Sequence, residues 1–197
     1  MFMQAALPPF DHPIDAMYAI HEALRAEAAY AETLVRNLPV GDACEEFQQA
    51  FVRWAIALEY HAVTEDRYMT ADVDRPVART NEEEHQHLTV LLGDLQAFLP
   101  TLAAEGITAR SRRHLLGKVV ELRVAQDDHL EEEEERILPV LREYRSQAQQ
   151  QEIAQHLLVD QASQNPGWVL AWLAPYITAE EHQRLTALTA QHATLPA

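Results

Sequence analysis

Apolar positions recur at alternating intervals of three and four residues along most of the chain, which is the spacing of one face of an α-helix. The first such stripe consists of Ile14, Met17, His21, Leu24, Ala28, Ala31, Val35 and Leu38. The second consists of Phe47, Phe51, Trp54, Leu58, His61, Glu65 and Tyr68. The pattern predicts long amphipathic helices that each bury one face.

Two further stripes follow the same spacing. The third consists of Asn81, His85, Leu88, Leu92, Leu95 and Leu99. The fourth consists of Leu115, Val119, Leu122, Gln126, His129, Glu133, Ile137 and Val140. Each of the four stripes therefore points one histidine toward the place where a helical bundle packs its core, and two of them add a glutamate one turn later.

Turn residues divide the stripes into separate helices. Breaks are predicted at NLPVGD (37–42), ADVDRP (71–76), LPTLAAEGIT (99–108) and LP (138–139). They leave four long helices, near residues 13–38, 43–70, 76–99 and 108–138. Only 5 glycines occur and β-branched alternation is scarce. The fold class predicted is all-α, with an up-down-up-down four-helix bundle.

The last part of the chain predicts shorter helices. One lies in SQAQQQEIAQHLLVDQAS, one is opened by Asn165 and Pro166, and one begins at a capping box formed by Thr178 and Glu181. We expect the bundle to occupy residues 12–141. Residues 142–197 are then a C-terminal helical extension packed on the bundle rather than a second domain.

The charge balance excludes two classes of partner. Lys and Arg total 15 against 31 Asp and Glu, so the formal charge of −16 repels nucleic acid and anionic membrane surfaces. No apolar run approaches the roughly 20 residues that span a bilayer. Cys44 is the single cysteine and the N-terminal residues lack the features of a signal peptide. We therefore expect a cytoplasmic protein.

Residue counts test whether the four histidines lie at one level in such a bundle, at about 1.5 Å per helical residue. Counted from the predicted turns, the first three histidines lie level with one another. The last pair disagrees, because His85 lies 15 residues before Pro100 whereas His129 lies 21 residues after Thr108. This difference corresponds to about 9 Å, which the predicted loop would have to absorb.

The convergence of these side chains indicates a metal site. A lone histidine on a helical stripe is more often a hydrogen-bonded core residue than a ligand, but four at one level are different. Glu65 and Glu133 add two carboxylates to the same layer, and burying them costs several kcal/mol each unless cations compensate. Imidazole and carboxylate together suit iron, manganese or zinc, and two carboxylates can bridge a pair of ions.

At these residues the sequence resembles the hemerythrin-like family of HHE cation-binding domains. The resemblance rests on HEALRAE (21–27), HAVTED (61–66), EHQHL (84–88) and HLEEEEERILP (129–139), which occur in the family's order. It covers roughly residues 12–141. It implies a non-haem di-iron centre, with two iron ions, or manganese or zinc in their place, held by His21, His61, Glu65, His85, His129 and Glu133.

One departure from the family pattern concerns the third helix. Hemerythrin-like oxygen carriers place two histidines one turn apart there, whereas Asn81 and Thr89 flank His85. We expect Thr89→His to supply the missing imidazole and to slow oxidation of a bound oxygen species. Glu82 is a candidate extra ligand, and His87 is expected to face solvent.

The acidic run after His129 and three tyrosines give further expectations. Glu134 or Asp128 is a candidate for a position just outside the ligands, while the other glutamates of the run face water. Tyr18, Tyr60 and Tyr68 are candidates for the same surroundings. A ferritin-like centre is a lesser alternative, because the chain offers only one Glu-x-x-His pair, from Glu82 to His85.

The resemblance implies binding of dioxygen or a related small molecule, for sensing, storage or detoxification. Two alternatives are a di-iron peroxidase or oxidase and a metal-responsive interaction module. In the last case the extension is a candidate surface for a homo-oligomer or a protein partner.

Overall fold

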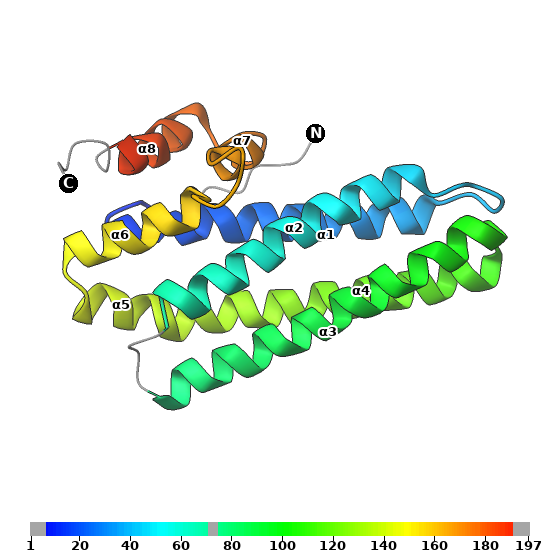
Figure 1. Ribbon diagram of the computed structural model, residues 1–197, viewed down its shortest axis with the longest axis horizontal. Coiled ribbons are helices and arrows are strands. Elements are labelled where there is room, and N and C mark those ends of the chain that lie inside the picture. Colours follow the sequence, from blue (N-terminus) through cyan, green and yellow to red (C-terminus); the bar gives the residue numbers. More distant parts are fainter. Residues whose placement is uncertain (1–6, 71–74, 191–197) are drawn as a thin grey trace.

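The computed structural model describes residues 7–70 and 75–190, which are helical and contain no β-strand. Four antiparallel helices form the bundle (Figure 1): α1 (Ala16–Asn37), α2 (Glu45–Tyr68), α3 (Arg75–Glu105) and α4 (Ala109–Glu132). Helix α1 packs on α2 and α4, and α3 packs on the same two helices. The predicted up-down-up-down four-helix bundle is confirmed. Most of the break predicted at 71–76 lies outside the described residues.

The first helix is preceded by a short 3-10 turn, η1 (Pro13–Asp15), which agrees with the helix start predicted near residue 13. The turn between α1 and α2 contains Gly41, whose φ of 87° is accessible to glycine at little cost. Its backbone N–H donates to the Ile107 carbonyl at 2.7 Å. The α1–α2 turn is thereby fixed to the α3–α4 turn at the same end of the bundle.

Helix α3 does not end at Pro100, so the break predicted at 99–108 was wrong in its start. The helix continues to Glu105, and Pro100 is exposed on its outer face. A proline inside a helix removes one backbone hydrogen bond and costs about 3 kcal/mol. Burial of Leu95 and Leu102 on the inner face, at 0% and 1% exposure, offsets this cost. Gly106, with φ 71°, ends the helix.

The chain also continues past the break predicted at 138–139. Helix α4 passes into a π-helical turn, η2 (Glu133–Ile137), and then into α5 (Leu138–Tyr144). Pro139 lies in the first turn of α5, where its missing N–H costs least. The passage from α4 to α5 is therefore made by a π-helical turn that begins at Glu133. Turns of this π type occur preferentially at functional sites.

The extension consists of α6 (Gln147–Leu158), α7 (Trp168–Leu173) and α8 (Ala179–Ala190). Helix α6 packs on η1 and α2, and α7 packs on α1 (Figure 1). The capping box of α8 is confirmed, since the Thr178 hydroxyl accepts from the Glu181 N–H and the Glu181 carboxylate accepts from the Thr178 N–H. Helix α7 begins two residues after Pro166.

The predicted stripes form the core of the bundle. Leu24, Leu58, Leu95 and Leu122 are at most 1% exposed, and each such leucine stabilises the fold by about 1.5–3 kcal/mol. The indole N–H of Trp54 donates to Gln126 Oε1 at 2.6 Å, which satisfies a polar group in the core. Only the ends of the stripes, such as Tyr68 and Val140, are partly exposed. Among the described residues, no helix has the length and apolar character needed to cross a membrane.

Candidate metal centre

Every side chain predicted to bind metal lies in one buried layer across the bundle. Helix α1 supplies one histidine, α2 a histidine and a glutamate, α3 one histidine, and α4 with η2 the last pair. All are at most 4% exposed. In chain order they are His21, His61, Glu65, His85, His129 and Glu133.

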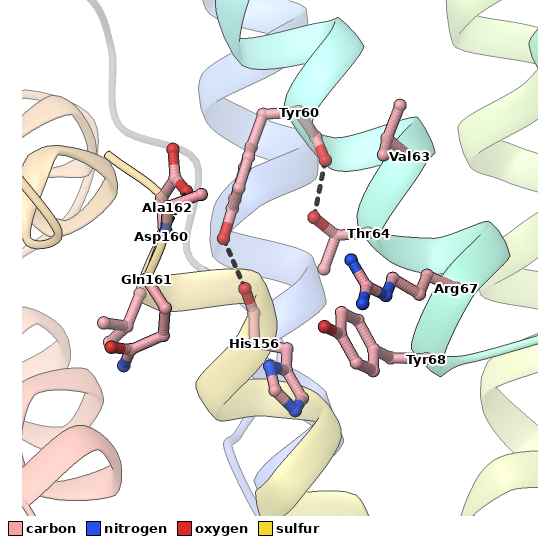
Figure 2. Close-up of a pocket in the computed structure, with 10 residues that line it drawn as sticks. Tyr60, Val63, Thr64, Arg67, Tyr68, His156, Asp160, Gln161 and Ala162 are labelled. Carbon is pink, nitrogen blue, oxygen red and sulfur yellow. Dashed lines mark hydrogen bonds between the residues drawn. The ribbon is translucent and has the colours of Figure 1, made fainter. Parts of the chain in front are cut away.

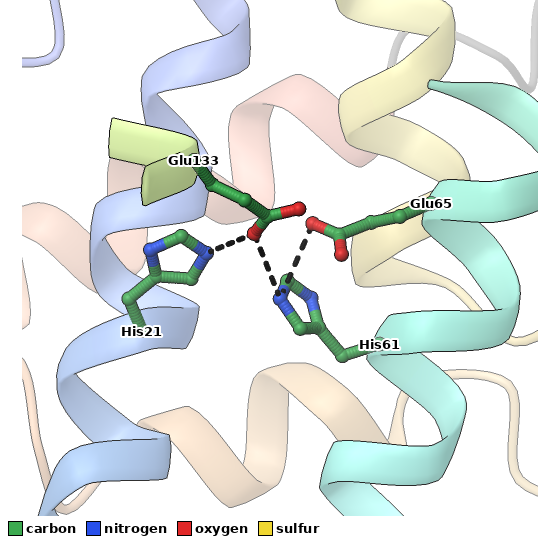
Figure 3. Close-up of side chains that lie close together, drawn as sticks. All are labelled: His21, His61, Glu65 and Glu133. Atoms are coloured by element: carbon green, nitrogen blue, oxygen red, sulfur yellow. Dashed lines mark ion pairs between the residues drawn. The ribbon is translucent and has the colours of Figure 1, made fainter. Parts of the chain in front are cut away.

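The layer consists of two overlapping groups of potential ligands. In each group the ligand atoms lie within 4.8 Å of one another. His21 and His61 belong to the first group and His85 and His129 to the second. Glu65 and Glu133 belong to both. Figure 3 shows the first group, in which the two carboxylates point toward each other and the imidazoles of His21 and His61 turn toward them.

Each histidine directs its Nε2 atom toward one of the shared carboxylates. The shortest Nε2–oxygen distances are 3.4 Å from His21 to Glu133, 3.2 Å from His61 to Glu65, 3.3 Å from His85 to Glu65 and 3.7 Å from His129 to Glu133. These distances bring ring nitrogens close to carboxylate oxygens without making well-formed hydrogen bonds. All four carboxylate oxygens, and Nε2 of His21 and His61, have no hydrogen-bond partner among the described residues.

Unpartnered buried atoms of this kind fit a cation. A buried carboxylate without hydrogen bonds costs several kcal/mol, so two of them side by side need compensation. Imidazole nitrogens and carboxylate oxygens are both ligands for transition metals, and they converge here from four helices. The residues present therefore fit one ion in each group, with Glu65 and Glu133 common to both.

The pKa shifts of the pair express the same electrostatic conflict. Burial, with the charge of Glu133 added, raises the pKa of Glu65 well above its ordinary value. Burial alone would also raise the pKa of Glu133, but the charges of His129 and His21 hold it below its ordinary value. Burial, together with the charge of His21, lowers the pKa of His61 and favours its neutral form, which is the form that binds metal.

Three of the four histidines are held by a carboxylate at the other ring nitrogen. The Nδ1 atom of His21 lies 2.8 Å from Glu134, that of His85 lies 2.8 Å from Asp66, and that of His129 lies 2.9 Å from Glu84. Such contacts favour a proton on Nδ1 and direct Nε2, the atom that would bind a metal, toward Glu65 and Glu133. The orientation of these imidazoles is thus set by protein contacts alone.

These three carboxylates each link neighbouring helices of the bundle in the same way. Each is the sequence neighbour of a residue in the layer and reaches the histidine of the adjacent helix: Asp66 from α2 to α3, Glu84 from α3 to α4, and Glu134 from η2 to α1. The series stops at His61, whose Nδ1 has no partner in the described part of the chain. His61 is therefore the least constrained imidazole of the layer.

Comparison with known families agrees with this geometry. A family model described as the hemerythrin HHE cation binding domain matches residues 12–157, which is most of the chain. The chain belongs to the hemerythrin family. No curated protein and no solved structure matches it. The matched region extends into α6.

Near the hemerythrin ligand positions, Glu82 is exposed, so the extra ligand considered from sequence does not face the layer. Of the two residues considered for a position just outside the ligands, Asp128 is exposed. Glu134 does lie just outside the layer, where Arg25 also donates to its carboxylate at 2.8 Å. Asp66 and Glu84 were missed, although each adjoins a predicted ligand in the HAVTED and EHQHL motifs.

The third helix of the hemerythrin domain presents Asn81, not Thr89, to the interior. Thr89 is exposed and its hydroxyl donates to the His85 carbonyl at 2.9 Å, so the face assigned to it from sequence was wrong. Asn81 is 2% exposed and lies one turn before His85. Neither polar atom of its amide has a hydrogen-bond partner among the described residues. His87 is exposed, as expected.

The three tyrosines considered from sequence bond elsewhere in the hemerythrin domain. The Tyr18 hydroxyl accepts from Arg142, the Tyr60 hydroxyl donates to the His156 carbonyl, and the Tyr68 ring stacks on the His156 ring. Tyr60 and Tyr68 also line a surface pocket of about 440 Å³ between α2 and the end of α6 (Figure 2). None of the six predicted ligands lines this pocket.

Proposed function

We propose that this chain is a non-haem di-iron protein that binds dioxygen or a related small molecule, for sensing, storage or detoxification. The observation that carries the proposal is the sharing of Glu65 and Glu133 between two groups of buried ligands. His21 and His61 would complete one metal position, and His85 and His129 the other. Membership of the hemerythrin family, whose domain is described as cation binding, supports metal binding at these positions.

The composition of the layer supports iron. It offers imidazole nitrogens and carboxylate oxygens, the mixed set that iron, manganese and zinc accept. The single thiol, Cys44, lies 17 residues before His61 at the start of α2, roughly 25 Å away along the helix. Asp66, Glu84 and Glu134 bring further negative charge to the histidines, which strengthens the imidazoles as metal ligands.

The small-molecule role is supported by the number of protein ligands. Each position would receive two imidazoles and two shared carboxylates, which is fewer than the six ligands of octahedral iron. Bound iron would supply open coordination positions and redox chemistry for dioxygen or peroxide. Asn81 is placed to donate a hydrogen bond to a molecule bound on the α3 side, because its buried amide has no partner among the described residues.

Stopped-flow absorption after mixing the anaerobically reduced, iron-loaded protein with dioxygen tests the proposal. We expect a rapid change in the visible spectrum that is missing from zinc-loaded protein, because zinc has no accessible redox change. Glu133→Gln should lose the change together with its iron. An unchanged spectrum at verified full iron content would refute binding of dioxygen at this layer.

A further inference from the structure

Four aromatic rings form a continuous series from α2 into the extension. The ring centroids of Tyr60 and Trp168 lie 5.3 Å apart, those of Trp168 and Trp172 lie 6.4 Å apart, and those of Trp172 and Tyr176 lie 6.2 Å apart. These separations are within the range of direct aromatic contact. We call Tyr60, Trp168, Trp172 and Tyr176 the aromatic chain.

The inner end of the aromatic chain is joined to the metal centre through the backbone of α2. Tyr60 precedes His61 in α2, so their Cα atoms are about 3.8 Å apart and joined by one peptide unit. Figure 2 shows the Tyr60 side chain reaching from α2 to α6, where its hydroxyl donates to the His156 carbonyl. The outer end, Tyr176, is half-buried near the start of α8.

Both indoles of the aromatic chain donate their N–H to carboxylates. Trp168 Nε1 lies 3.1 Å from Asp160 Oδ2, and Trp172 Nε1 lies 3.3 Å from Glu27 Oε1. Glu27 is 1% exposed, and its Oε2 atom has no hydrogen-bond partner among the described residues. Tyr176 interacts with the same carboxylate, which, together with burial, raises the pKa of its hydroxyl.

A carboxylate at an indole N–H makes the ring easier to oxidise. Its negative charge stabilises the positive charge left when the ring loses an electron, more strongly in a buried site than in water. The carboxylate can also accept the N–H proton, so that the oxidised ring becomes neutral. Tyr60 donates to a backbone carbonyl, which accepts no proton. An electron vacancy is therefore expected to rest on Trp172 or Tyr176 beside Glu27, rather than on Tyr60.

We propose that the aromatic chain conducts electrons, one at a time, between the protein surface at Tyr176 and the metal centre beside His61 during the reduction of hydrogen peroxide. This rests on the proposed di-iron function. Reduction of one peroxide to two waters takes two electrons and two protons, and solvent supplies the protons. The electrons leave Trp172 and Tyr176, and their N–H and O–H protons pass to Glu27 and then to solvent. Two molecules of a small one-electron donor at the surface, with two protons from solvent, restore the rings.

Packing alone would also bring aromatic rings together where the extension lies on the bundle. Tyr60, Trp168, Trp172 and Tyr176 do border the hydrophobic core. If the rings only pack together, the most exposed rings should be oxidised first. If they conduct electrons, the rings connected to the metal centre should be oxidised first, whatever their exposure. Tyr144 separates the two cases, because it is 73% exposed and lies outside the aromatic chain.

The test is peptide mass spectrometry of the full-length, iron-loaded protein after treatment with hydrogen peroxide and no reductant. We expect oxidation products on Trp172 and Tyr176, with Tyr144 unmodified, and a protein radical in samples frozen during the reaction. The zinc-loaded protein should show neither. Oxidation of Trp172 and Tyr176 in the zinc-loaded protein, or oxidation of residues in order of their exposure, would overturn the proposal that the aromatic chain conducts electrons.

Trp168→Phe interrupts the aromatic chain while keeping a ring in the contact. We expect oxidation of Trp172 and Tyr176 to fall to the zinc-loaded level, with iron content and melting temperature unchanged. Tyr144→Phe is the matched control and should behave as wild type. Unchanged oxidation in Trp168→Phe overturns the inference. If the wild-type protein binds iron and consumes peroxide while Trp172 and Tyr176 stay intact, the inference is overturned but the di-iron proposal stands. If the protein fails to bind iron, the inference and the di-iron proposal are both overturned.

Discussion

The Nε2 atom of His85 lies 3.0 Å from the Nε2 atom of His129, and the Nδ1 atom of each ring is already engaged by a carboxylate. Asp66 and Glu84 favour a proton on each Nδ1 and so direct both Nε2 atoms into the same buried space beside Glu65. Two neutral rings with protons on Nδ1 would repel there, and a cation held by both Nε2 atoms and Glu65 would replace this repulsion by coordination.

Metal content should depend on the shared carboxylates. We expect wild-type protein from iron-supplemented cells to carry one ion for each of the two ligand groups. Glu133→Gln should lose most of this metal, because it removes a charge common to both positions. Glu131→Gln changes an exposed glutamate of the same acidic run and should retain the metal. Elemental analysis makes the comparison, and equal metal in both variants would remove Glu133 from the site.

Removal of metal should destabilise the fold. Stripping the ions leaves Glu65 and Glu133 buried without compensation, and a ligand present at 100 times its Kd stabilises the native state by about 2.7 kcal/mol. For a chain of this size that corresponds to roughly 5–10 °C in melting temperature. Thermal unfolding with and without chelator, at verified occupancy, measures it. Coinciding curves would contradict compensation by metal.

The carboxylates that hold Nδ1 should tune metal affinity without binding metal. We expect Asp66→Asn, Glu84→Gln and Glu134→Gln each to weaken binding by about 10–100-fold, because each loosens one imidazole. Glu83→Gln, beside Glu84 but exposed, is the control. Competition with a metal-binding dye gives the affinities. Wild-type affinity in the first three variants would mean that the observed contacts do not position the histidines.

Asn81 offers a test of oxygen chemistry on α3. Because no second imidazole stands one turn from His85 on this helix, we expect the reduced protein to react with dioxygen but to autoxidise quickly. Asn81→His places an imidazole on the buried face and should slow that decay. Thr89→His places it on the exposed face and should leave the decay unchanged. Stopped-flow spectra decide, and equal decay in both variants would exclude Asn81 from the site.

Acid sensitivity of the metal-free bundle should include a contribution from Glu32 of α1. Burial would raise the pKa of Glu32, but hydrogen bonds from Arg36 and from Arg123 of α4 hold it below the ordinary 4.5. A depressed pKa stabilises the fold above the unfolded value, and the contribution is lost as pH falls through the folded value. Glu32→Gln should therefore cost about 1 kcal/mol at neutral pH.

The difference between Glu32→Gln and wild type should shrink as the pH falls below about 4.5. Urea unfolding across the pH range measures it, with Glu143→Gln, an exposed substitution, as the control. A difference independent of pH would show that the loss comes from packing rather than from charge.

The spacing of apolar residues was sufficient to predict the bundle and the six side chains that meet in it. The one mismatch in level, between His85 and His129, came from ending the third helix at Pro100. Because α3 runs on to Glu105, His85 lies 21 residues before Gly106, which matches the 21 residues from Thr108 to His129. Burial of the inner face, which a local proline rule does not include, decided the length of the helix.

The carboxylates around the layer could not be assigned from sequence. The chain has 31 acidic residues, and which of them reaches Nδ1 depends on the rotation of each helix about its axis. Glu82, Glu83 and Glu84 adjoin one another, yet only Glu84 meets His129. The π-helical turn at Glu133 was likewise not predicted from sequence.

X-ray diffraction from iron-loaded crystals at the iron absorption edge tests the dinuclear centre most directly. The expected result is two anomalous peaks in the buried layer, one beside His21 and His61 and one beside His85 and His129, with Glu65 and Glu133 contacting both. A single peak, or iron bound only at the exposed acidic run while the layer holds none, would contradict a shared-carboxylate di-iron centre.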